Sequence, residues 1–267
     1  MLRKTNILGI SVTNEKREKI LEYVMDFLKN SGKKGYIVTP NPEMVVAATR
    51  DSEFKDILNK ADLALPDGVG LTWAAQILRT QLPERITGVD FIEDLCRKAQ
   101  EKPVTIGFLG GGPGVAQKVA ECLQKKYPWI KVRYVSEEWS GLNAGWRNDT
   151  SDVFRYSKER QSNTSGSEKQ KLDILFVAFG APKQEKWIAL HLDELPVTLA
   201  MGVGGSLDYL SGTVSRAPIL VRSMGLEWLY RLIRQPWRWR RQLALAEFVW
   251  LVCKARFLSL STADMGQ

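Results

Sequence analysis

Five short motifs hold glycines or amide, acidic and basic side chains, and four of the five follow a run of apolar residues. The first is Thr39-Pro40-Asn41-Pro42-Glu43, after the apolar run 35–38. Its two prolines favour a sharp turn into a helix, with Asn41 as the cap and Pro42 in the first turn. The turn alone explains these residues. The alternative is that Thr39 and Asn41 carry their side chains to the mouth of a binding site.

The second motif, Pro66-Asp67-Gly68-Val69-Gly70, places an aspartate after the apolar run 63–65. Two roles are open for Asp67. It caps the helix that follows, or it acts as a general base. A carboxylate in the second role assists glycosyl transfer to a hydroxyl, because the hydroxyl loses its proton as the new bond forms.

The third motif joins Arg85 to the turn Thr87-Gly88-Val89-Asp90. A guanidinium beside a glycine turn suits an anionic diphosphate, although a single arginine is more often solvated. Arg85 and Asp90 are therefore candidate substrate-binding residues.

The fourth motif holds the triplet Gly110-Gly111-Gly112, between an apolar run and the helical segment 115–126. Glycines let the backbone approach a phosphate, and a helix N-terminus attracts its charge. The spacing is not that of the dinucleotide fingerprint G-x-G-x-x-G. Glu137 follows the next apolar run, where a ribose-binding acid is expected. We predict a nucleotide site here, and the alternative function is a nucleotide-dependent oxidoreductase that uses the glycine triplet.

The fifth motif, Pro182-Lys183-Gln184-Glu185-Lys186, opens a helix after the apolar run 174–179. As ordinary helix-start residues, Gln184 and Glu185 need no function. Their position next to the other motifs at the same edge of the predicted sheet favours a role in substrate binding.

Alternating apolar runs and amphipathic segments predict the scaffold that positions these motifs. The alternation indicates an α/β fold with a Rossmann-like, mostly parallel sheet flanked by helices. The expected strands are 7–12, 35–38, 63–65, 104–109, 132–135, 174–179 and 197–203, and clear helical segments are 15–29, 69–78 and 115–126. Ligands of such folds bind at the carboxyl ends of the strands, so we expect the five motifs at one sheet edge.

A change in composition divides the chain near residue 212. We predict an α/β catalytic domain over 1–212 and a basic, helical, membrane-associating appendage over 213–267. Nine basic and two acidic residues between Arg216 and Arg256 give this stretch a net charge of +7, out of +8 for the whole chain. Such a surface suits phosphate groups of a membrane or a nucleic acid. The polar segment 143–171 is expected to be a surface loop or a loosely packed helix.

The sequence lacks the residues that several classes of enzyme chemistry require. The single histidine, His191, is expected on a helix surface, which argues against Ser-His-Asp and Cys-His catalysis. The three cysteines fit neither a disulfide framework nor a zinc site, so a reducing compartment is expected. The P-loop signature and an Asp-x-Asp metal motif are both missing. We expect no metal, no cofactor and no membrane-spanning segment.

Together the motifs resemble the WecG/TagA/CpsF family, glycosyltransferase family 26. The matching segments, in the family's order over most of the chain, are TPNPEMVVAA, ADLALPDGVGLTWAA, RITGVDF, GFLGGGPGVA, DILFVAFGAPKQEKWI, MGVGGSLDYLSGTVSRAP and GLEWLYRLIRQPWRWRRQ. The resemblance implies an inverting, metal-independent transfer of an N-acetylmannosamine-type sugar. It implies a UDP-sugar donor and a polyprenyl-diphosphate-linked sugar acceptor, in the synthesis of a cell-surface polysaccharide or teichoic acid.

The resemblance also assigns roles to residues. Asp67 becomes the candidate base, and Arg85 faces phosphate. Thr39 and Asn41 contact a sugar, and Gln184 lines the same pocket. The family's C-terminal arginines, which help to hold the diphosphate, match Arg231, Arg238 and Arg241. Their spacing places them on one helical stripe, which Pro236 interrupts.

The resemblance and the charge predict where the enzyme acts. At roughly 1 kcal/mol per basic residue near an anionic leaflet, the basic stretch holds the chain to a membrane. The expected location is cytoplasmic, peripheral on the inner face of the cell membrane. The expected partners are the UDP-sugar, the lipid-linked acceptor and that membrane surface, without nucleic acid, and a homo-oligomer stays open. A non-enzymatic module that binds nucleic acid or membrane is the remaining alternative.

Overall fold

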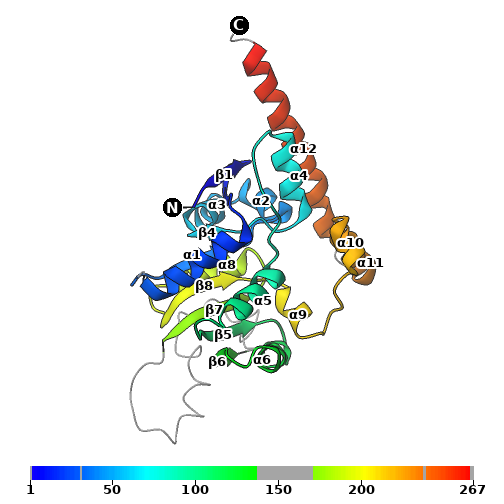
Figure 1. Cartoon of the computed structure of the whole chain (residues 1–267). Helices are drawn as coiled ribbons and strands as arrows, with labels where there is room; N and C mark the ends of the chain where they lie inside the picture. Colours follow the sequence, from blue (N-terminus) through cyan, green and yellow to red (C-terminus); the bar gives the residue numbers. More distant parts are fainter. Residues whose placement is uncertain (1, 31, 137–170, 237–238, 265–267) are drawn as a thin grey trace, which may run out of the picture. The chain divides into compact units, whose positions relative to one another are not determined.

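The computed structural model describes residues 2–30, 32–136, 171–236 and 239–264 (Figure 1). The chain divides into two compact units, each built from separate stretches of sequence. The first unit comprises Met1–Ile20, Thr39–Thr87 and Ser215–Gln267, and the second comprises Leu21–Val38 and Gly88–Val214. Helix α1 (Arg17–Asn30) runs from the first into the second.

Parallel strands form the core of the second unit. They lie in the order β3 (Gly35–Val38), β8 (Val197–Gly202), β7 (Leu172–Ala178), β5 (Thr105–Gly110) and β6 (Lys131–Ser136). Phe176 on β7 is in register with Phe108 on β5 and with Met201 on β8, and all three side chains are fully buried. This arrangement confirms the predicted mostly parallel α/β sheet.

Helices flank these strands. They are α5 (Gly88–Lys98), α6 (Val115–Lys126), α8 (Lys183–His191) and the short α9 (Ser206–Leu210). Helix α6 packs on β5 and β6, and α8 packs on β3, β7 and β8. The buried residues of α6 include Val115, Val119 and Leu123, which recur every four positions and form the apolar stripe of an amphipathic helix.

The first unit begins with a hairpin where the sequence predicts one strand over 7–12. Strand β1 (Lys4–Ile7) pairs antiparallel with β2 (Ile10–Thr13). The turn places Leu8 at φ 51° and Gly9 at φ 86°, and the amide of Gly9 donates to Asn6 Oδ1 over 2.9 Å. The single-strand prediction is wrong because the apolar run 7–12 conceals a turn, in which Leu8 adopts a φ that such residues rarely take.

Helices make up most of the rest of the first unit. They are α2 (Pro42–Ala48), α3 (Ser52–Lys60), α4 (Val69–Ile77), α10 (Ile219–Ser223), α11 (Glu227–Arg234) and α12 (Trp239–Asp264), with the two-residue strand β4 (Leu63–Ala64). The long helix α12 packs against α2 and α4. Phe248 and Val252 of α12 are buried. Helix α4 also approaches α2 closely at Gly70, because an added Cβ there would lie 2.5 Å from Pro42 Cγ.

Some sequence expectations find no test in this fold. Most of the polar segment 143–171 lies outside the described residues. The division into a 1–212 domain and a 213–267 appendage stays a prediction. Within the described part of the chain, no helix combines the length and the apolar character that crossing a membrane requires.

The packing of α12 yields a stability prediction. Phe248→Ala removes a side chain that is 2% exposed. We expect the free energy of unfolding to fall by about 3–5 kcal/mol, because a large buried ring leaves a cavity. Phe257→Ala, on the same helix but 73% exposed, is the matched control. Chemical denaturation of both variants measures the difference, and equal losses would contradict the assigned packing of α12.

Candidate active site

Two backbone hydrogen bonds bring three of the five motifs together within the first unit. The amide of Asp67 donates to the carbonyl of Pro40 over 2.9 Å, and the amide of Ile86 donates to the carbonyl of Pro66 over 2.9 Å. These bonds tie the loop after β3 to the loop after β4, and that loop to the segment that contains Arg85. The positions of Thr39, Asn41, Asp67 and Arg85 are therefore set by one hydrogen-bonded group of loops.

Asn41 is the N-cap of α2, as its sequence context predicts. Its backbone is extended, and its Oδ1 accepts from the amide of Met44 over 3.0 Å. Pro42 occupies the first helical position. Thr39, two residues earlier, is buried. Capping accounts for Oδ1 of Asn41 and does not involve its amide nitrogen, so a sugar contact through that nitrogen stays a prediction.

Asp67 directly precedes Gly68, the residue before α4. The N-cap position belongs to Gly68, at φ 85°, and not to Asp67. The Asp67 side chain is partly exposed. The structure thus places a carboxylate near solvent at the start of a helix, between the Pro40 loop and the Arg85 segment. Its role as a base stays a prediction.

Arg85 belongs to a charged cluster that includes residues from the C-terminal part of the chain. Arg85 Nη2 lies 3.9 Å from Glu227 Oε2, and Arg216 Nε lies 3.5 Å from Glu227 Oε1. Arg216 Nη2 donates to Thr87 Oγ1 over 3.3 Å. Sequence reasoning missed the roles of Arg216 and Glu227. One signal was available, because Glu227 is the only acidic residue between Arg216 and Glu247.

The C-terminal arginines are only partly described. Arg231 lies on α11, four residues after Glu227, and its Nε donates to Gln235 Oε1 over 3.4 Å. Residues four apart share one face of a helix, so Arg231 and Glu227 are neighbours on α11. Arg238 lies outside the described residues, and so does the side chain of Arg241. The predicted stripe of three arginines therefore stays a prediction.

The glycine triplet of the second unit adopts conformations that favour glycine. Gly110, Gly111 and Gly112 have φ values of 91°, 95° and 83°. The amide of Gly111 donates to the carbonyl of Ala178 over 3.2 Å, and a Cβ at Gly110 would lie 3.0 Å from that same oxygen. Only open space surrounds the Cβ position of Gly112. The loop therefore suits close approach of a ligand to its backbone.

The other substrate-binding candidates of the second unit have different outcomes. Asp90 lies in the first turn of α5 and is partly exposed. Glu137 lies outside the described residues. The roles of these two residues and of the glycine triplet in binding substrate stay predictions.

Gln184 is buried and joins two loops. Its Oε1 accepts from the amide of Gly180 over 3.1 Å and from the amide of Gly204 over 2.9 Å. Its Nε2 donates to Glu185 Oε1 over 2.7 Å. Gly202 makes room for this pair, since a Cβ there would lie 2.9 Å from Gln184 Nε2. Gln184 thus connects the loop after β7 to the loop after β8.

Glu185 is a buried carboxyl group with one partnered oxygen. Its side chain is 0% exposed, and no hydrogen-bond partner for Oε2 exists among the described residues. Burial raises the pKa of Glu185 to about 7, against the opposing effect of the Gln184 hydrogen bond. The sequence gives no warning of this, because glutamates at helix starts are usually solvated.

The expectation that His191 lies on a helix surface is wrong. The residue ends α8 and is buried, not on the surface. Its ring packs against Trp187, with ring centroids 5.1 Å apart. The sequence around His191 did not reveal that α8 is covered at its C-terminal end.

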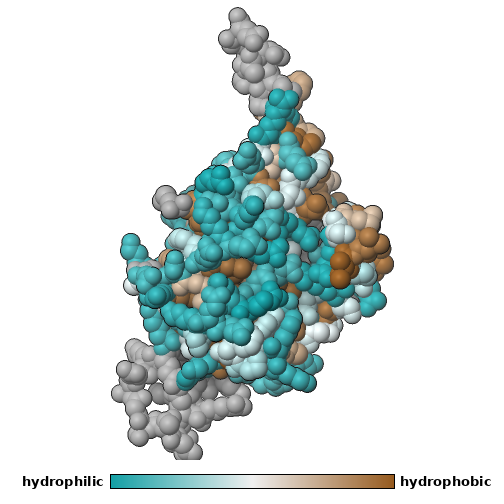
Figure 2. All heavy atoms as spheres, in the orientation of Figure 1, coloured by the Kyte–Doolittle hydropathy of each residue, from teal (hydrophilic) through white to brown (hydrophobic). Residues whose placement is uncertain are grey.

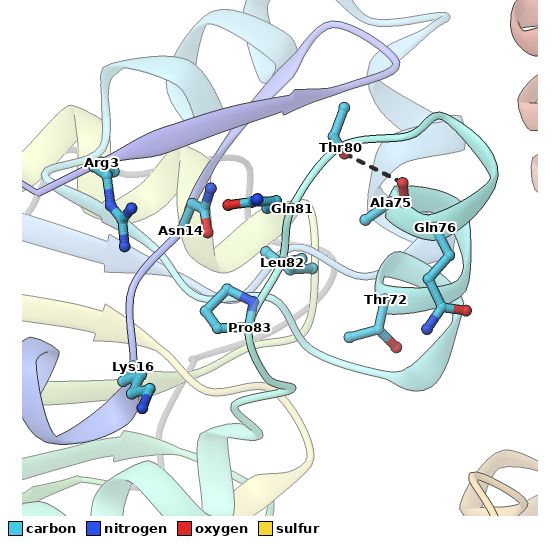
Figure 3. Close-up of a pocket in the computed structure, with 10 residues that line it drawn as sticks. All are labelled: Arg3, Asn14, Lys16, Thr72, Ala75, Gln76, Thr80, Gln81, Leu82 and Pro83. Atoms are coloured by element: carbon cyan, nitrogen blue, oxygen red, sulfur yellow. Dashed lines mark hydrogen bonds between the residues drawn. The ribbon is translucent and has the colours of Figure 1, made fainter.

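A separate pocket of about 390 Å³ lies in the first unit (Figure 3). Figure 3 shows Arg3, Asn14 and Gln81 on one side of the pocket, with Gln81 directed toward Asn14, and Thr72 and Gln76 of α4 on the other side. Arg3 also pairs with Glu15 over 3.2 Å. None of the sequence-predicted site residues lines this pocket.

No group of three or more His, Cys, Asp or Glu residues in the part of the chain that the structure describes has the arrangement to hold a metal ion. The expectation that catalysis needs neither metal nor cofactor stays a prediction.

Comparison with known proteins settles the family. Residues 5–261 match the glycosyl transferase WecG/TagA/CpsF family. The chain belongs to this family. It is therefore a glycosyltransferase, and the resemblance stated from its motifs is confirmed.

Three relatives share the name N-acetylglucosaminyldiphosphoundecaprenol N-acetyl-beta-D-mannosaminyltransferase. The Bacillus subtilis (strain 168) protein is 30% identical over 95% of this chain and 92% of its own length. The Bacillus spizizenii protein is 32% identical over 89% and 86%, respectively. The Staphylococcus aureus (strain MW2) protein is 29% identical over 95% and 93%.

The buried carboxyl of Glu185 yields a pH-dependent prediction. Its folded pKa of about 7 exceeds the ordinary value of 4.5, so the folded protein holds this proton more tightly than the unfolded chain. Stability therefore falls as pH rises from about 4.5 to about 7, by up to roughly 3 kcal/mol. Glu185→Gln stays neutral. We expect it to melt at a higher temperature than the natural protein at pH 8, and the gap to close toward pH 5.

Thermal unfolding monitored by circular dichroism at several pH values measures this effect. Glu121→Gln removes the same charge from an exposed position on α6 and is the control. We expect Glu121→Gln to melt with the natural protein at pH 8. A Glu185→Gln variant that is destabilised equally at pH 5 and pH 8 would refute the buried-proton explanation.

Proposed function

We propose that this glycosyltransferase catalyses an inverting, metal-independent transfer of an N-acetylmannosamine-type sugar. The donor is a UDP-sugar, and the acceptor is a sugar linked to polyprenyl diphosphate. The shared name of the relatives describes transfer of N-acetylmannosamine to N-acetylglucosaminyldiphosphoundecaprenol, and it supports both the sugar and the acceptor class. The pathway implied is synthesis of a cell-surface polysaccharide or teichoic acid.

The observation that carries the proposal is the hydrogen-bonded group of loops around Asp67. It holds a partly exposed carboxylate on the same set of loops as a guanidinium, Arg85. Glycosyl transfer needs both groups. A base must accept the proton of the attacking hydroxyl, and a cation must stabilise the charge that develops on the leaving diphosphate.

The proposed reaction is a single displacement. Asp67 accepts the proton of the acceptor hydroxyl, and the hydroxyl oxygen forms a bond to the anomeric carbon of the donor sugar. The bond between that carbon and the diphosphate oxygen breaks, and UDP leaves with the electron pair. Attack from the face opposite to UDP inverts the anomeric carbon. Arg85 stabilises the departing diphosphate.

Further residues are proposed to bind substrate. In the first unit, Thr39 and Asn41 contact a sugar, and Arg231, Arg238 and Arg241 help to hold the lipid diphosphate. In the second unit, the proposed substrate-binding residues are Asp90, Gly110, Gly111, Gly112, Glu137, Gln184 and Glu185. The buried hydrogen bonds of Gln184 favour a role in shaping two loops after strands, where ligands of α/β folds bind.

Membership of a glycosyltransferase family weakens both alternatives. An oxidoreductase needs the glycine triplet to bind a redox cofactor, but its spacing departs from the dinucleotide fingerprint. A purely binding module leaves Asp67 and Arg85 without a purpose. The basic stretch is better explained by a membrane that carries the acceptor than by a nucleic acid.

We also propose that α10, α11 and α12 hold the enzyme to the inner face of the cell membrane. Figure 2 shows apolar residues gathered over α10 and α11. The most exposed large apolar side chains in and directly after these helices are Ile219, Leu220, Met224, Ile233, Leu243 and Phe257. Exposed apolar side chains next to basic ones match the composition of helices that lie in a membrane interface.

Substitution of the proposed base tests the mechanism. Asp67→Asn should lower kcat by about 10²–10⁴, because general-base catalysis contributes on that order. The assay is acceptor-dependent UDP release in EDTA, with a panel of UDP-sugars and a short-chain lipid-diphosphate-GlcNAc acceptor. Asp56→Asn, at an exposed position on α3, is the control and should keep its kcat. No UDP release by the natural protein with any donor would count against the proposed reaction, and a normal kcat for Asp67→Asn against the base.

Introduction of negative charge on α10 tests the membrane surface. Ile219 and Leu220 are 77% and 72% exposed, so replacing both by glutamate should leave the fold intact. We expect binding to anionic vesicles to weaken roughly tenfold or more, because two apolar side chains leave the interface and two negative charges enter it. Leu190→Glu, on α8 and 58% exposed, is the control. Vesicle sedimentation measures both variants, and undiminished binding of the double variant would disprove this surface.

A further inference from the structure

In the charged cluster around Glu227, one carboxylate lies near two guanidinium groups. Glu227 opens α11, and each of its two carboxylate oxygens faces a different arginine. Arg85 belongs to the hydrogen-bonded loops around Asp67, and Arg216 is anchored at Thr87, two residues from Arg85. Two guanidiniums from distant parts of the sequence thus converge on one anionic group.

The contacts within this cluster are long. The two nitrogen–oxygen distances are 3.9 Å and 3.5 Å, whereas a charge-assisted hydrogen bond measures about 2.7–2.9 Å. The exposed fractions of the Arg85, Glu227 and Arg216 side chains are 22%, 17% and 20%, so solvent reaches all three. A loosely held, solvent-accessible carboxylate contributes little stability, and a better anion can replace it.

A diphosphate is such an anion. Its oxygens are stronger hydrogen-bond acceptors for guanidinium groups than one carboxylate is, and its two phosphate groups can engage two arginines at once. We propose that Arg85 and Arg216 together bind the diphosphate group of a substrate, and that Glu227 occupies this site until the diphosphate displaces it. The proposal rests on the proposed function, and it adds Arg216 as a binding residue and Glu227 as an intramolecular competitor.

The displacement has a structural consequence. Glu227 is in the first turn of α11, so its release frees the start of that helix from Arg85 and Arg216. Arg231 lies one turn later on the same helix. Binding of the diphosphate therefore changes what holds α11 in place, and it couples the site to the helix that carries the first of the predicted C-terminal arginines.

Calorimetric titration with inorganic pyrophosphate tests the site. The full-length natural protein, Arg216→Gln, Glu227→Gln and Glu247→Gln are compared in EDTA at low salt. Arg216→Gln should weaken pyrophosphate binding about tenfold, because a charge-assisted contact is lost. Glu227→Gln should tighten it about three- to tenfold, because the competitor no longer carries a charge. Glu247→Gln also removes one negative charge and an ion pair, with Arg50, and should leave the affinity unchanged.

A purely structural role for Glu227 predicts the opposite result. In that case Glu227→Gln weakens binding or leaves it unchanged, and either result overturns the proposal. Thermal melting checks that each variant is folded. If Glu227→Gln is unfolded, Arg216→Gln decides alone, and natural affinity in that variant overturns the proposal. Absence of pyrophosphate binding to the natural protein at millimolar concentration overturns it as well.

Two more ligands identify the source of the diphosphate. UDP represents the donor, and farnesyl diphosphate represents the lipid-linked acceptor. Affinity changes that appear with UDP alone assign the site to the donor, and changes with farnesyl diphosphate alone assign it to the acceptor. Turnover without any of these binding changes would overturn the diphosphate site but leave the proposed function standing. Binding changes in a protein that releases no UDP would support the diphosphate site but contradict the proposed function.

Discussion

The candidate active site depends on two backbone hydrogen bonds, from Asp67 to Pro40 and from Ile86 to Pro66. They join three loops that carry different chemistry: amide and hydroxyl groups, a carboxylate, and a guanidinium. Each loop alone is explained by local turn or cap geometry, as the N-cap bond of Asn41 shows. Only their connection gives the carboxylate and the guanidinium fixed positions on one framework, which is what a displacement reaction requires of its base and its cation.

The second unit shows a different constraint, the burial of polar side chains. Gln184 donates and accepts inside the protein, and it binds the loops after β7 and β8 through two backbone amides. Glu185 orients the Gln184 amide by accepting from it. A buried carboxyl group is tolerated because it takes up a proton, and burial favours this by raising the pKa of Glu185 to about 7. Gly202 is part of the same arrangement, since a larger residue would collide with the pair.

The sequence predicted the features that depend on local pattern. Apolar runs located the strands of the second unit, and the proline turn after 35–38 located the Asn41 cap. Features that depend on distant residues were not predictable. In the sequence, Arg216 and the acidic Glu227 both belong to a mostly basic stretch that is expected to be solvated. Only the fold brings these two residues close to Arg85. The prediction that His191 lies on a helix surface was wrong for a similar reason, because the burial of this residue depends on what covers the end of α8.

The cluster around Glu227 and the apolar surface of α10 and α11 have one property in common. Both hold side chains that interact more favourably with another molecule than with water. The apolar side chains gain free energy on entering a lipid interface. The guanidiniums gain more from a diphosphate than from the carboxylate they now share. A lipid-linked diphosphate offers both environments in one molecule, since its chain lies in the membrane and its phosphates lie at the surface. A substrate of that kind therefore complements both the apolar surface of α10 and α11 and the two arginines that face Glu227, whereas a soluble nucleotide complements only the arginines.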